Sequence, residues 1–203
     1  HQGRGRQRRP AQHGGDGLPS LRPLLRLRDA HPAGHDAAGR EPARRLRPRP
    51  AGDPPLKKLL LALGNDLLGD DGVAFAAARL LREGPRDYEV VESAETGLAL
   101  LDHLEGFDQA VLLDAIFTGK HGPGTVLEFG PDDFKMAPAP SNHFAGLPEM
   151  IKLAQRLRMR FPKDLRILAM EVDNPIVFRQ TLTPEARKAL PAFVERARRL
   201  LSA

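Results

Sequence analysis

The chain has 203 residues, a formal net charge of +5 and a pI near 10, and this length suits one domain with a hydrophobic core. It contains no cysteine, which excludes disulfides, thiol nucleophiles and cysteine-ligated metal sites. No apolar run reaches the roughly 18–20 residues that span a bilayer, and no signal peptide is visible, so we expect a soluble, cytoplasmic protein without membrane contact.

Residues 1–55 differ in composition from the rest of the chain. They hold twelve Arg, no Lys and five acids, a net charge of +7, which leaves −2 for the remainder. Too few apolar residues are present to offset the entropy of ordering, so we expect a disordered tail. The chain opens on His, and the composition also fits a GC-rich region read upstream of a true start; both readings stay open. Because the basic charge is confined to this tail, nucleic-acid binding is not expected.

From Leu56 onward, short apolar runs alternate with amphipathic ones, as in chains whose strands and helices alternate. The predicted strands cover 57–64, 88–93, 108–116, 124–130 and 165–172, the fourth at an edge of the sheet. The predicted helices cover 70–84, 97–106, 147–161 and 183–201. Thr183 is the expected N-cap of the last helix, with Pro184 at its first position. This order predicts an α/β sandwich, with a mostly parallel sheet and helices on both faces.

Polar side chains stand where an open parallel sheet binds ligands, beyond the carboxyl ends of its strands. Asp70 and Asp71 follow the first strand, and Asp114 ends the apolar run "AVLLDA". His143 lies in the loop before the third helix. An acid at a helix N-terminus is often only a cap, and a loop histidine often has no role. One aspartate suffices for capping, however, and a carboxylate at the end of a buried strand needs a partner or a crevice.

Two carboxylates and one imidazole form an incomplete coordination set for a divalent transition metal. Other chemistries lack their motifs. The sequence has no H-E-x-x-H helix of a zinc peptidase and no G-x-S-x-G nucleophile elbow, and "GNDLLG" does not match the dinucleotide fingerprint.

Three stretches of the chain resemble the [NiFe] hydrogenase maturation endopeptidases, in this order: "LGNDLLGDDGVA", "LLDAIFTGKHGPGTV" and "NHFAGLPEMIKLA". The resemblance covers residues 56–203, which we take as the protease domain. It implies a three-layer α/β fold with a twisted five-stranded sheet. It also implies an endopeptidase that removes the C-terminal extension of a hydrogenase large-subunit precursor after nickel insertion. The segment "MEVDNPIVFRQTLTPE" follows the family pattern only loosely, which leaves the particular hydrogenase open.

The resemblance assigns recognition of the precursor's nickel to Asp71, Asp114 and His143. We expect Asp71 and Asp114 to be catalytic as well, either as a base or through the metal acting as a Lewis acid. Nickel arrives with the substrate, so no tightly bound cofactor is expected, and the chain is expected to be monomeric.

The rest of the first motif receives two roles. Gly64, Asn65 and Asp70 are expected to contact the substrate, and Asp70 is also expected to cap the helix that follows. Two alternatives to the peptidase stay open, a non-catalytic metal-dependent assembly factor and a different hydrolase on a similar fold.

Overall fold

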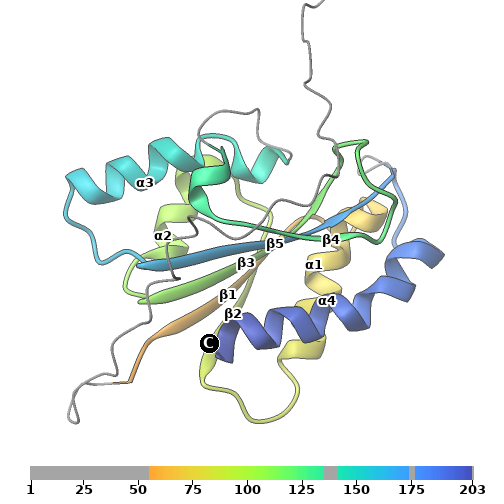
Figure 1. Ribbon diagram of the computed structural model, residues 1–203, viewed down its shortest axis with the longest axis horizontal. Coiled ribbons are helices and arrows are strands. Elements are labelled where there is room, and N and C mark those ends of the chain that lie inside the picture. The colour runs from red at the N-terminus through yellow and green to blue at the C-terminus, as the bar shows by residue number, and fades with distance from the viewer. Residues whose placement is uncertain (1–54, 135–140, 174–176, 203) are drawn as a thin grey trace, which may run out of the picture. The chain divides into compact units, whose positions relative to one another are not determined.

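The computed structural model describes residues 55–134, 141–173 and 177–202, so the expected tail lies outside the described residues apart from Pro55 (Figure 1). Five strands form one sheet: β1 (Lys58–Leu63), β2 (Tyr88–Ser93), β3 (Gln109–Ile116), β4 (Val126–Phe129) and β5 (Asp164–Glu171). Their spatial order is β2-β1-β3-β5-β4. All neighbours pair in parallel except β4, which runs antiparallel to β5 at the edge. The predicted α/β fold and the edge position of the fourth strand are confirmed.

Helices cover both faces of this sheet (Figure 1). The bounds of the α-helices are α1 (Val73–Leu81), α2 (Leu100–Leu104), α3 (Leu147–Arg156) and α4 (Pro184–Ser202). α1 and α4 pack on the face that carries Leu60 and Ala62, whereas α2 and α3 pack on the face that carries Leu59 and Leu61. β1 is therefore buried on both faces, which explains its uninterrupted apolar sequence. No helix in the described part is both long and apolar enough to cross a membrane.

α3 ends at Arg156, earlier than the predicted end at residue 161. The chain turns at Arg158, whose φ of 56° places it in the left-handed region. The Arg158 amide donates to the carbonyl of Gln155 (3.2 Å), and the Met159 amide donates to that of Ala154 (3.0 Å). This pair of bonds is the Schellman motif, which satisfies the last carbonyls of a helix. The motif could not be predicted from the sequence, because an arginine occupies the left-handed position where glycine is usual.

Asp70 joins the start of α4 to the turn that follows β1. Thr183 caps α4 as predicted, since its Oγ1 accepts a hydrogen bond from the Ala186 amide (3.2 Å). The Asp70 carboxylate accepts from the Thr183 amide (2.6 Å) and from its hydroxyl (2.7 Å). The expectation that Asp70 caps the helix after it is wrong. Both aspartates lie in a 3-10 turn, Gly69–Gly72, and α1 has no side-chain cap.

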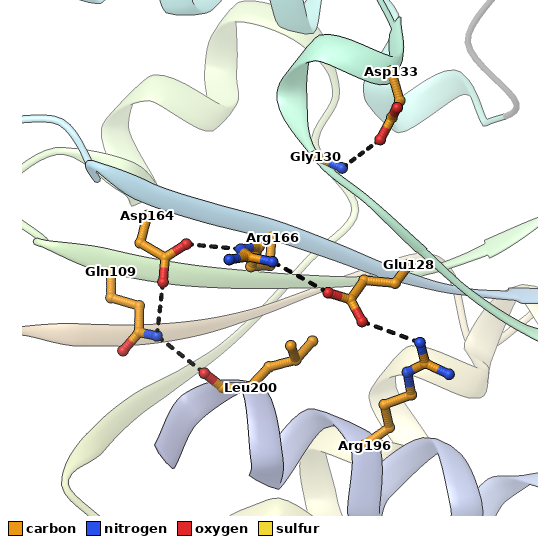
Figure 2. A network of polar contacts seen from close by, with 8 residues as sticks. All are labelled: Gln109, Glu128, Gly130, Asp133, Asp164, Arg166, Arg196 and Leu200. Carbon is orange, nitrogen blue, oxygen red and sulfur yellow. Dashed lines mark hydrogen bonds and ion pairs between the residues drawn. The ribbon is translucent and has the colours of Figure 1, made fainter. Parts of the chain in front are cut away.

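A polar network lies near the amino ends of β3 and β5, away from the carboxyl ends of the strands (Figure 2). Glu128 of β4 accepts from Arg166 of β5 (3.3 Å) and from Arg196 of α4 (3.1 Å). Gln109 donates to Asp164 (3.2 Å) and to a backbone carbonyl of α4 (3.0 Å). The arginine–glutamate pairs are partly exposed, and such pairs contribute at most about 1 kcal/mol each. The network therefore aligns the edge strand with α4 more than it stabilises the fold.

Replacing Thr183 with Ala removes both the cap of α4 and one partner of the buried Asp70 carboxylate. We expect Thr183→Ala to lower the free energy of unfolding by roughly 1–3 kcal/mol, measured by urea denaturation. Thr96→Ala is the matched control, because Thr96 precedes a 3-10 turn without a side-chain cap bond. Equal free energies of unfolding for the two variants would show that the Asp70–Thr183 contact does not stabilise the fold.

Candidate metal centre

Three side chains converge at the carboxyl ends of the two neighbouring strands β1 and β3. Asp71 comes from the turn after β1, Asp114 from β3, and His143 from a 3-10 turn, Asn142–Phe144, that precedes α3. One potential ligand atom of each lies within 4.8 Å of the others. The strand pleat explains why, because Asp114 shares its face with Ala110 and Leu112, and this is the face that α3 covers.

The Asp114 carboxyl group is fully buried and only partly satisfied. Oδ1 accepts a hydrogen bond from the Ala115 amide (2.8 Å). Within the described ranges, Oδ2 has no hydrogen-bond partner of good geometry. Burial raises the pKa of Asp114 well above its usual range, and the nearby Asp71 charge adds to this. The Ser141 hydroxyl and the Ala115 amide lower that pKa in part. A buried oxygen without a partner carries a substantial desolvation penalty, which a bound cation would remove.

Asp71 is half-buried, and burial raises its pKa above the usual range, while His143 and a backbone hydrogen bond from Asn65 lower it in part. Gly64 allows the turn to lie this close to β1. Its φ is +146°, and a Cβ atom there would lie 2.1 Å from the Asp71 carbonyl oxygen. Asn65 shapes the same turn, because its Oδ1 accepts from the Leu67 amide (3.0 Å). Gly64 and Asn65 thus have structural roles, and their contact with substrate stays a prediction.

The imidazole of His143 is oriented by a backbone carbonyl that sequence reasoning missed. Nδ1 of His143 lies 3.0 Å from the carbonyl oxygen of Glu95. A carbonyl only accepts hydrogen bonds, so Nδ1 carries a proton, and in the neutral ring Nε2 is the nitrogen with a lone pair for a metal. The Glu95 side chain is held in turn by His103 (2.7 Å). A backbone carbonyl has no residue signature, so no pattern in the sequence could have identified it.

Glu171 is a second residue that sequence reasoning missed. This carboxylate is 1% exposed and ends β5. It accepts from the Thr118 amide (2.7 Å), the Thr118 hydroxyl (2.8 Å) and the Gly119 amide (2.9 Å). It therefore holds the start of the loop that follows β3. The signal was present, since Glu171 ends an apolar strand in the same way as Asp114 does.

The donor set suits a transition metal that brings other ligands with it. Two donors on bonds of about 2.1 Å to one ion lie at most about 4.2 Å apart, so modest side-chain rotations bring all three donors to one ion. Imidazole and carboxylate together bind divalent transition metals, and three donors leave positions open. A cavity of about 620 Å³ lies elsewhere, between α3 and the amino end of β5, and none of the three donors lines it.

The chain is similar to proteins described as hydrogenase maturation proteases. A family model described as hydrogenase maturation protease matches residues 76–200, a stretch that contains Asp114 and His143 and begins after Asp71. The Hydrogenase 2 maturation protease of Escherichia coli (strain K12) is 28% identical over 124 residues, which make up 57% of this chain and 73% of the relative.

Solved structures agree with this similarity. The [NiFe] hydrogenase maturation protease HybD from Thermococcus kodakarensis is 31% identical, with a TM-score of 0.58, over 72% of this chain and 99% of its own. The hydrogenase maturating endopeptidase HybD from E. coli has a TM-score of 0.59, over 70% of this chain and 90% of its own. At 23% identity, this second structure supports the fold alone.

The buried Asp114 carboxyl lowers the stability of the metal-free protein as the pH rises. Between the ordinary aspartate pKa and the raised native pKa, the native state binds the proton more tightly than the unfolded chain does. Stability that is present at low pH is therefore lost as the pH rises through this window. We expect Asp114→Asn to remove that loss and to raise the unfolding free energy at neutral pH by roughly 1–3 kcal/mol.

The measurement is thermal melting in the presence of a chelator from pH 4 to 7.5. The gap between Asp114→Asn and wild type should widen as the pH rises. Asp102→Asn, on the exposed side of α2, should follow the wild type throughout. A constant gap across the range would contradict the assignment of a raised pKa to Asp114.

Proposed function

Because the chain belongs to the hydrogenase maturation protease family and is thus a protein-processing endopeptidase, we propose that it removes a C-terminal extension from a [NiFe] hydrogenase large-subunit precursor and recognises that precursor by its nickel. The family membership sets aside the alternative of a non-catalytic assembly factor. The substrate and the role of nickel are our proposal, and they rest on the chemistry of the metal centre.

The observation that carries the proposal is the convergence of Asp71, Asp114 and His143 around one point, together with a buried oxygen of Asp114 that has no hydrogen bond of good geometry within the described residues. The three donors come from segments far apart in the chain and have no shared structural task within the described residues. Nickel in the precursor sits among thiolates and can accept further donors. This chain offers imidazole and carboxylate and, having no cysteine, no thiolate that would compete for the ion.

Binding of the precursor through its nickel would fix the scissile peptide bond at the carboxyl ends of β1 and β3, a proximity effect. Asp71 is the better general base of the two acids, because it is half-buried and reaches solvent, whereas Asp114 is fully enclosed. In this scheme Asp71 takes a proton from water, the hydroxide adds to the peptide carbonyl, and the proton passes to the departing amine. Asp114, His143 and the second carboxylate oxygen of Asp71 hold the nickel and orient the substrate.

The proposal is tested with the full chain and a large-subunit precursor in nickel-loaded and nickel-free forms. We expect a shortened precursor only in the nickel-loaded form, detected by intact mass. Binding of the loaded precursor without shortening would refute the peptidase assignment for this substrate. Equal cleavage of both forms would refute recognition through nickel but keep the protease activity.

Removal of the imidazole tests the assignment of the third donor. His143→Ala should lower the rate of processing at least about 100-fold, because the precursor is positioned through its nickel and the variant loses one of the three donors. His121→Ala is the matched control, since His121 is exposed on the loop after β3, and it should process at the wild-type rate. Normal processing by His143→Ala would remove this histidine from the site.

A further inference from the structure

We propose that Leu67, Val177 and Phe178 form an apolar patch that docks the precursor beside the metal centre, with Phe178 as its anchor. This inference rests on the proposed function, because the occupant is the same large-subunit precursor. It adds a contact that is independent of nickel and that comes from the segment after β5.

Exposed apolar side chains are concentrated at the end of the sheet that carries the metal centre. The described residues include eight exposed large apolar side chains, of which five follow the carboxyl end of a strand: Leu67, Leu98, Phe117, Val177 and Phe178. Phe178 is 86% exposed, the largest value among them. Single exposed apolar residues are common, whereas a contiguous exposed group indicates an interaction surface, so contacts between the segments decide which of the five belong together.

Backbone hydrogen bonds bring the members of the patch together. The Arg179 amide donates to the Leu67 carbonyl (3.1 Å), and the Gly69 amide donates to the Arg179 carbonyl (2.6 Å). Leu68 and Arg179 thus form a parallel bridge between the turn after β1 and the segment after β5. A Cβ atom at Gly69 would lie 3.4 Å from the carbonyl oxygen of Val177, so the two segments are in contact.

The same two segments carry the metal centre. Asp70 binds Thr183 through two hydrogen bonds, and its Oδ1 lies 3.8 Å from Nη2 of Arg179. The next residue is Asp71, a donor of the metal centre. The patch is therefore fastened to the turn that presents Asp71, so we infer that a protein whose nickel contacts Asp71 reaches the patch as well.

The composition of the patch determines what it can bind. None of its three side chains carries charge, so the complementary surface is an apolar segment of the precursor next to its nickel. One phenylalanine buries about 150–250 Å² when fully covered, far less than the roughly 800 Å² per partner of a standard interface. Phe178 is thus an anchor within a larger contact, the kind of residue that dominates binding energy.

The test measures kcat and KM for the nickel-loaded precursor with Phe178→Ala. We expect KM to rise about tenfold or more, kcat to change less than twofold, and the melting temperature to stay at the wild-type value, because Phe178 is outside the core. Leu157→Ala is the matched control, since Leu157 is 63% exposed but lies after α3, and its KM should equal that of the wild type.

Three outcomes would overturn the inference. A KM for Phe178→Ala within twofold of the wild-type value refutes docking at the patch and leaves the proposed function intact. A wild-type dimer that Phe178→Ala converts to monomers, seen by sedimentation, assigns the patch to a second copy of this chain. A wild-type chain that neither binds nor shortens the loaded precursor refutes the proposed function and the docking surface together. If Phe178→Ala melts lower, Phe178→Leu keeps an apolar side chain and should recover most of the affinity.

Discussion

The arrangement of the residues around the metal centre depends on one contact, made by the buried carboxylate of Asp70. It joins the turn after β1 to the first residues of α4 by two hydrogen bonds from Thr183. A carboxylate that is 3% exposed is tolerated only when it is paired in this way. The contact holds three features in one arrangement: the turn that presents Asp71, the segment that presents Phe178, and the start of the helix that covers one face of the sheet.

This contact explains why two acids stand side by side in the sequence. Adjacent like charges repel, so a pair persists only when each has its own task. Asp70 is bound within the protein, whereas Asp71 lies with Asp114 and His143 in the candidate metal centre. The doublet thus serves a structural contact and the proposed chemistry within one 3-10 turn.

Much of the fold and the three donors could be predicted from the sequence, because both follow local rules. Apolar runs in β1 and β3 predict buried strands, and parallel strands bring their carboxyl ends to one edge, which placed Asp71 and Asp114 together. The partner of Asp70 could not be predicted, since Thr183 lies 113 positions away and its own local role as an N-cap already explained it. The carbonyl of Glu95 is beyond sequence reasoning for a different reason: every residue carries one.

The location of the 620 Å³ cavity matters for anyone who seeks to block this protein with small molecules. The cavity lies between α3 and the amino end of β5, at the opposite end of the strands from the metal centre. A screen guided by volume alone would select compounds for this cavity, which none of the three proposed metal donors lines. An inhibitor designed for the proposed metal centre would instead carry a metal-chelating head group and an aromatic tail for Phe178.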